Sequence, residues 1–145
     1  MNSITSTRRT FLWSCLAAGA GPMILSKGGR AQNAPAQKIT LAMIGMGRQS
    51  IHINLPAFLK MPEVQVVAVC DVDAWRLEQA KAAVDGHYGN TDCAAYRDWR
   101  EVVARDDIDA IMNATPDHWH VPISLAAVNA GKHVSCEKPL TLSVA

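Results

Sequence analysis

The chain has 145 residues, of which 49% are hydrophobic, and its formal net charge is +1. This length and composition suffice for one globular domain with its own core and exclude a disordered chain. The small net charge gives no electrostatic reason to expect nucleic-acid binding.

The first 31 residues differ from the remainder in charge, because they hold four basic residues and no acidic one. Arg8 and Arg9 precede an apolar stretch that ends at Leu25. This pattern predicts a twin-arginine signal over residues 1–31, with cleavage after Ala31 and export of the folded protein to the periplasm by the twin-arginine machinery. The stretch is too short for a stable membrane span, and a surface helix or tail is the alternative interpretation.

Residues 32–37 form a polar linker, and strand and helix signals alternate through residues 38–145. Apolar, β-branched runs predict strands at 38–44, 64–70, 93–96, 108–114 and 132–136. Helices are predicted at 48–60, 74–84, 99–105 and 115–130, with another opening at 141–143. Pro56 is expected to kink or shorten the first of these helices. Asp73 and Asp98 are predicted helix N-caps, and Gly131 is the predicted residue after a helix C-cap. The alternation predicts an α/β fold, a Rossmann doubly wound parallel sheet with helices on both faces.

A glycine turn follows the first predicted strand and opens a helix, which is the order that pyrophosphate binding requires. Gly45 is expected to make the tight turn, and Gly47 to let the phosphates approach the backbone. Ser50 takes the third small-residue position of the fingerprint. We therefore predict cofactor contacts at Gly45, Gly47, Arg48, Gln49 and Ser50.

Asp71 follows the second predicted strand. At this position a carboxylate is expected to accept hydrogen bonds from ribose hydroxyls and to repel a 2′-phosphate, which favours NAD over NADP. Arg76 lies close in sequence and offers a contact for a phosphate, so NADP is the alternative cofactor. A capping or turn-forming role is the other interpretation of Asp71.

The fourth predicted strand is followed by Thr115, Pro116, His118 and His120, where the backbone is expected to run beside the cofactor. The two histidines are two positions apart and do not share a helix face, which argues against a metal-binding pair. The sequence also has no C-x-x-C motif, so no metal site is predicted. A helix-start or core role is the alternative for each histidine.

Glu137, Lys138 and Pro139 follow the last predicted strand, at the same edge of the sheet. A lysine held there can donate a hydrogen bond to a substrate hydroxyl and can relay a proton if its pKa is lowered. The Lys138–Pro139 bond is a candidate for the cis form. Lys138 is therefore the predicted catalytic residue.

These motifs in their order resemble the glucose–fructose oxidoreductase, inositol dehydrogenase and MocA family (Gfo/Idh/MocA), in its twin-arginine-exported branch. The resemblance covers residues 38–145. It rests on Gly-x-Gly-x-x-Ser, Cys-Asp-Val-Asp, Tyr-x-Asp-Trp, Ile-Asp-Ala-Ile, Thr-Pro-Asp-His-Trp-His, Ala-Gly-Lys-His-Val and Cys-Glu-Lys-Pro-Leu.

The resemblance implies an NAD(P)-dependent oxidoreductase that transfers a hydride between a sugar or polyol and a nicotinamide cofactor. In such an enzyme Lys138 would contact the substrate and assist hydride transfer. Thr115 and Pro116 would lie on the nicotinamide side, followed by His120. The expected cofactor-binding set is Gly45, Gly47, Arg48, Gln49, Ser50, Asp71, Thr115, Pro116, His118, His120, Glu137 and Lys138.

Members of this family are usually more than twice as long, and a second α/β domain supplies most of their substrate contacts. We therefore expect this chain to be an N-terminal part that lacks the second domain, from a protein that is a homo-oligomer when full length. An NAD-dependent glycosidase of the same superfamily and a non-catalytic nucleotide-binding module are the alternative functions. The presence of Lys138 favours the dehydrogenase.

Overall fold

The computed structural model describes residues 38–141. Its elements are β1 (Ile39–Ile44), the π-helix η1 (Ser50–Asn54), α2 (Leu55–Leu59), β2 (Val64–Cys70), α3 (Ala74–Tyr88), β3 (Ala94–Tyr96), α4 (Trp99–Val103), β4 (Ala110–Asn113), α5 (Asp117–Asn129) and β5 (His133–Cys136). The predicted signal, the linker and residues 142–143 of the last predicted helix lie outside the described residues. Within residues 38–141, no helix is both long and apolar enough to cross a membrane.

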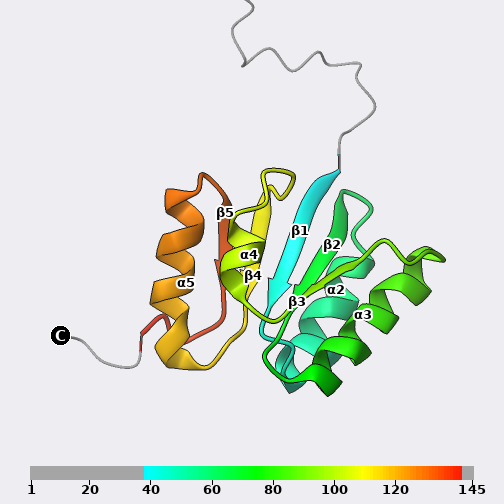
Figure 1. Ribbon diagram of the computed structural model, residues 1–145, viewed down its shortest axis with the longest axis horizontal. Helices are drawn as coiled ribbons and strands as arrows, with labels where there is room; N and C mark the ends of the chain where they lie inside the picture. The colour runs from blue at the N-terminus through cyan, green and yellow to red at the C-terminus, as the bar shows by residue number, and fades with distance from the viewer. Residues whose placement is uncertain (1–37, 142–145) are drawn as a thin grey trace, which may run out of the picture. The chain divides into compact units, whose positions relative to one another are not determined.

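The five strands form one parallel sheet with the order β3-β2-β1-β4-β5. The chain runs outward from β1 to β3 and then returns to lay β4 against the other side of β1. The direction of winding therefore reverses between β1 and β4, which is where ligands bind in such sheets. Helices α2 and α3 cover one face and α4 and α5 cover the other (Figure 1). The predicted doubly wound parallel sheet is confirmed.

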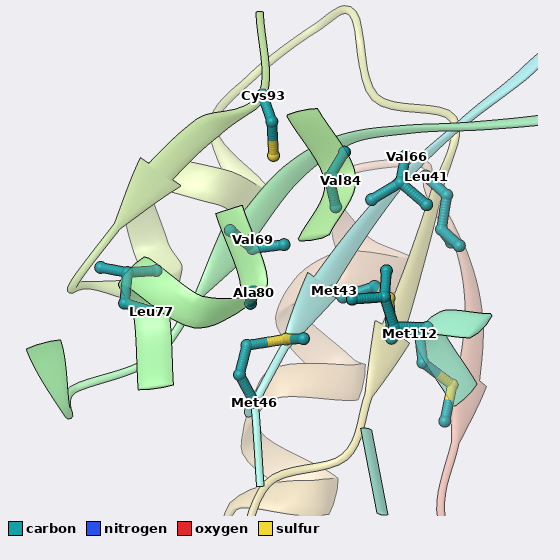
Figure 2. Close-up of a cluster of buried hydrophobic side chains, with 11 residues drawn as sticks. Leu41, Met43, Met46, Val66, Val69, Leu77, Ala80, Val84, Cys93 and Met112 are labelled. Carbon is teal, nitrogen blue, oxygen red and sulfur yellow. The ribbon is translucent and has the colours of Figure 1, made fainter. Parts of the chain in front are cut away.

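Each face of the sheet has its own apolar core, because successive side chains of a strand point to opposite faces. Leu41 and Met43 of β1 join the core under α2 and α3, whereas Ala42 and Ile44 join the core under α4 and α5. Figure 2 shows the first of these cores, to which α3 contributes Leu77, Ala80 and Val84. Burial on both faces explains why β1 and β2 are almost continuously apolar in sequence.

The helix predicted over residues 48–60 is divided directly before Pro56, where a kink or an early end was expected. A π-helix at Ser50–Asn54 precedes α2, and the Leu55 N–H donates to the Ser50 carbonyl five residues back. Pro56 lies in the first turn of α2 and has no N–H to donate. The lost donor gives a physical reason for the wider turn immediately before it.

Helix α3 continues past its predicted end at residue 84. Gly86, two residues beyond that predicted end, is helical on the exposed side, and Gly89 ends the helix with φ of +68°. The Tyr88 hydroxyl accepts a hydrogen bond from the Val66 N–H at 3.0 Å. This tie between the last helical residue and β2 offsets the cost of a glycine inside the helix.

The predicted caps are confirmed. Asp73 accepts hydrogen bonds from the N–H groups two and three residues further on, and Asp98 accepts one from two residues further on. Gly131 follows the C-cap of α5 with φ of +77°. The N–H groups of Gly131 and Lys132 bond back to the last turn of α5, so β5 starts one residue later than predicted, at His133.

Candidate functional site

The glycine turn connects β1 to the helical segment at the carboxyl edge of the sheet. Gly45 has φ of +87°, and a Cβ atom there would lie 2.7 Å from the backbone of Ala114, so no other residue fits. A Cβ atom on Gly47 would meet nothing within 4 Å. Gly45 therefore lets the turn pack against the loop after β4, while Gly47 leaves backbone open to a ligand.

A cavity of about 670 Å³ lies at this edge, within the size range of ligand pockets. It brings together eight of the predicted site residues: Gly45, Gly47, Arg48, Gln49, Asp71, Thr115, Pro116 and His118. The lining also includes residues that were not predicted for the site, among them Arg97, Trp99, Arg100 and Trp119.

Asp71 joins the end of β2 to the glycine turn. Its Oδ2 accepts a hydrogen bond from the Met46 N–H at 2.6 Å, and its Oδ1 accepts one from the Asp73 N–H at 2.9 Å. A carboxylate offers about four acceptor positions, so two remain for hydroxyl donors. The turn-forming interpretation of Asp71 is thus correct, and it leaves room for the ribose contact.

Four arginines line the cavity, Arg48, Arg76, Arg97 and Arg100. Arg76 is paired with Asp73, and Arg100 with Asp98, whereas Arg48 makes no ion pair within residues 38–141. The backbone N–H of Arg100 is the main cause that lowers the pKa of Asp98, which therefore stays ionised. The cationic side chains outnumber the anionic ones, which suits a ligand with negatively charged phosphates.

An aromatic wall closes one side of the cavity. The rings of Trp99 and Trp119 lie 6.4 Å apart, and the Arg100 guanidinium lies 4.6 Å from the centre of the Trp99 ring. Cys70 also lines the cavity, and burial raises the pKa of its thiol to about 12. This thiol is therefore neutral near pH 7 and unsuited to act as a nucleophile.

Ser50 begins the π-helix and is 1% exposed. Its hydroxyl oxygen is the buried side-chain polar atom without a hydrogen-bond partner within the described part of the chain. Ser50 does not line the cavity as a side chain. Its small size is what the fingerprint position requires, and its direct cofactor contact remains a prediction.

The residues after β5 form a second group beside the cavity lining. Glu137 is half-buried, and its Oε1 accepts a hydrogen bond from the Asn54 side chain at 2.9 Å. Lys138 is exposed, and the Lys138–Pro139 bond is cis, as anticipated. Neither Glu137 nor Lys138 lines the cavity. Their contacts with cofactor or substrate therefore remain predictions.

His120 is buried rather than directed into the cavity. Its two ring nitrogens lie 2.8 Å from the Thr115 carbonyl oxygen and 2.6 Å from the Pro139 carbonyl oxygen. Asn113, at the end of β4, is fully buried and donates to the His120 carbonyl at 3.0 Å, while its Oδ1 accepts from the Thr115 hydroxyl at 2.7 Å. His120 thus fits the alternative core role, and Asn113 is a site-supporting residue that the sequence analysis missed.

Lys132 was also missed as a supporting residue. It is 8% exposed, and its ammonium group donates to the carbonyl oxygens of Arg105 and Ile108. These bonds satisfy acceptors in the connection that follows α4, so Lys132 has a structural role. The available signal in the sequence was a lysine directly after the glycine that ends the helix, at the start of a predicted strand.

The residues at the cavity fit a dinucleotide. The observation that decides this is the open backbone at Gly47, which lines the cavity together with Arg48 and Gln49 at the start of the helical segment. Within residues 38–141, no group of three or more histidine, cysteine, aspartate or glutamate side chains is placed to hold a metal ion.

Comparison with known proteins identifies the family. A model described as the oxidoreductase family with an NAD-binding Rossmann fold matches residues 39–145. The chain belongs to the Gfo/Idh/MocA oxidoreductase family. The resemblance to this family drawn from the motifs is therefore confirmed, whereas its twin-arginine-exported branch remains a prediction.

Three Gfo/Idh/MocA relatives illustrate the match. A glycosyl hydrolase family 109 protein of Saccharopolyspora erythraea is 36% identical over 95% of this chain, and inositol 2-dehydrogenase 4 of the same organism is 32% identical over 72%. The crystal structure of scyllo-inositol dehydrogenase from Lactobacillus casei with bound NAD(H) and scyllo-inositol matches 74% of this chain, with a TM-score of 0.65 and 28% identity. This chain spans 34%, 29% and 30% of the lengths of these three proteins, respectively.

Proposed function

We propose that residues 38–141 bind NAD and form the cofactor part of an oxidoreductase that moves a hydride between a sugar or polyol and the nicotinamide ring. The observation that carries this proposal is the open backbone at Gly47 facing a cavity that Asp71 also lines. Bound NAD supplies the hydride acceptor. The inositol dehydrogenase relatives support a sugar or polyol as the substrate class.

The proposed roles follow from the position of each group. The backbone at Gly47 and the following N–H groups hold the pyrophosphate, and Arg48 adds a free positive charge. Asp71 accepts hydrogen bonds from ribose hydroxyls, which supports NAD over NADP because a 2′-phosphate would meet its charge. Thr115 and Pro116 line the nicotinamide side. Lys138 contacts the substrate hydroxyl and, with its amine neutral, takes up the proton that this hydroxyl releases on oxidation.

Calorimetric titration of the 145-residue chain with NAD and with NADP tests the cofactor. The proposal predicts one NAD per chain and weaker binding of NADP, and failure of both to bind at millimolar concentration overturns it. NADH formation by the full-length protein, measured at 340 nm with a panel of inositols and aldoses, tests the reaction. Lys138→Ala should lower this rate more than it lowers NAD affinity. Release of a chromogenic aglycone without net NADH would instead support the glycosidase of the family.

The N-terminal sequence supports a further proposal on export. We propose that residues 1–31 are a twin-arginine signal cleaved after Ala31, that residues 32–37 are a linker, and that the protein works outside the cytoplasm. Replacing Arg8 and Arg9 by lysine should keep the protein in the cytoplasm with its signal attached. Periplasmic accumulation of the twin-lysine variant would contradict the proposal.

We also propose that the full-length protein is a homo-oligomer. Size-exclusion chromatography with light scattering measures its mass directly. A monomer at micromolar concentration would contradict this expectation.

A further inference from the structure

His120 lies between the two loops that carry predicted cofactor and catalytic residues. It is in the first turn of α5 and is 1% exposed. Its Nε2 is 2.8 Å from the carbonyl oxygen of Thr115, in the cavity wall, and its Nδ1 is 2.6 Å from the carbonyl oxygen of Pro139. Pro139 directly follows Lys138. One imidazole ring therefore spans the loops after β4 and β5.

The nature of the two partners determines how many protons the ring needs. A carbonyl oxygen can only accept a hydrogen bond, and a neutral imidazole donates from one nitrogen while the other presents a lone pair. Either neutral tautomer would therefore direct a lone pair at a carbonyl oxygen. The doubly protonated ring donates to both oxygens.

We propose that His120 is a positioning residue that, when doubly protonated, ties the Lys138 turn to the cavity wall; we call this contact the His120 latch. The inference rests on the proposed function, since Lys138 and Thr115 act on substrate and cofactor only there. Asn113 restrains the two residues of the latch that follow β4. Its side-chain amide donates to the His120 carbonyl, and its Oδ1 accepts a hydrogen bond from the Thr115 hydroxyl. The bond from Asn54 to Glu137 restrains the β5 side independently.

The charge of the ring is influenced by every element packed against α5. The helix N-terminus opposes a cation at this position, and so do nearby positive side chains. Acidic side chains on the same elements favour the cation. The titratable and charged groups on the elements around the ring fall into two sets. On α5 and at α4 they are Asp117, His118, Asp98, Arg100 and Glu101. Before β4 and on or after β5 they are Asp109, His133, Cys136, Glu137 and Lys138. Both carbonyl acceptors contact the ring directly, and one of the two hydrogen bonds is lost if the ring loses a proton as the pH rises.

The protonation of the ring can be observed without cofactor or turnover. Long-range ¹H–¹⁵N correlation spectra of the labelled 145-residue chain report both ring nitrogens of each histidine, and His120→Gln assigns the signal. The latch predicts protons on both nitrogens of His120 at pH 6 and the loss of one as the pH is raised to 9. A neutral single tautomer at pH 6 overturns the proposal, whether or not NAD binds.

The effect of the latch is measured with His120→Gln. The glutamine amide has a single nitrogen and is therefore expected to replace the hydrogen bonds to the two carbonyl oxygens only in part. At pH 6 this variant should bind NAD about tenfold more weakly and should lose the pH dependence that wild type shows between pH 6 and 9. Amide hydrogen exchange in residues 133–141 should accelerate by a similar factor. His87→Gln, at an exposed histidine of α3 on the opposite face of the sheet, is the matched control and should behave as wild type.

Two results of the variant comparison overturn the latch. One is exchange in His120→Gln equal to that of wild type. The other is a pH dependence of NAD binding that persists in His120→Gln, which would assign it to another group such as His118. If wild type binds no NAD, the proposed function fails, but the exchange and the ring spectra still decide on the latch.

Discussion

Replacing Asp71 by alanine tests the origin of cofactor preference. The carboxylate accepts two backbone N–H groups, at 2.6 Å and 2.9 Å, and has two further acceptor positions toward the cavity. Hydrogen bonds to a charged group contribute roughly 1.5–3 kcal/mol each. When the carboxylate is removed, water bonds to the ribose hydroxyls and recovers part of this energy. Loss of the ribose contacts should therefore weaken NAD binding by about 10- to 100-fold, since about 1.4 kcal/mol corresponds to a factor of ten.

The same substitution should help NADP. A charge pair about 5 Å apart at an effective dielectric constant of about 20 interacts with about 3 kcal/mol, so Asp71 should repel a 2′-phosphate strongly. Removing the repulsion should lower the ratio of NAD affinity to NADP affinity by at least about tenfold.

Calorimetric titrations with both cofactors, at one fixed ionic strength, measure this ratio. Asp106→Asn is the charge-matched control, because Asp106 is exposed and does not line the cavity. Urea unfolding of each variant separates lost binding from lost folding, since Asp71 also holds the glycine turn. An unchanged ratio in a folded Asp71→Ala protein would refute the ribose role of Asp71.

Three further predictions concern the glycine turn, the two lysines and acid stability. Gly45→Ala should lower the free energy of unfolding by about 2–3 kcal/mol, because a Cβ there meets backbone at 2.7 Å. Gly47→Ala should change the free energy of unfolding by less than about 1 kcal/mol and should weaken NAD binding. Equal effects of the two variants on urea unfolding would contradict this prediction. Lys132→Met should cost about 1–3 kcal/mol by leaving two carbonyl groups unpaired, while Lys138→Met should leave the urea midpoint unchanged. Hydrogen bonds from the backbone and side chain of Thr40 lower the pKa of Asp109 below its ordinary 3.8, so the stability that Asp109 contributes is present above that pH and is lost on acidification. Asp109→Asn should therefore flatten the fall in the free energy of unfolding between pH 5 and pH 2. A fall as steep as that of wild type would contradict this prediction.

Local patterns in the sequence predicted the sheet and the glycine turn because the relevant physics is local. A two-sided apolar run such as that of β1 has few alternatives to a buried parallel strand. A turn that needs a positive φ selects glycine at position 45 whatever surrounds it. The same holds for the caps at Asp73 and Asp98, which act within three residues.

The missed features depend on contacts between distant segments. The extension of α3 through Gly86 is supported by the hydrogen bond from the Val66 N–H of β2 to the Tyr88 hydroxyl. The roles of Asn113 and His120 arise from loops that are adjacent only after folding. The spacing of apolar residues along the sequence does not show which carbonyl group a buried polar side chain will contact after folding.

Binding of NAD in the cavity at the carboxyl edge of the sheet can be tested directly. A titration of the ¹⁵N-labelled chain with NAD, followed by ¹H–¹⁵N correlation spectra, tests it residue by residue. The account predicts saturable shifts concentrated in residues 45–50, at Asp71 and in residues 115–118. No shifts at millimolar NAD, or shifts confined to the opposite edge of the sheet, would contradict it.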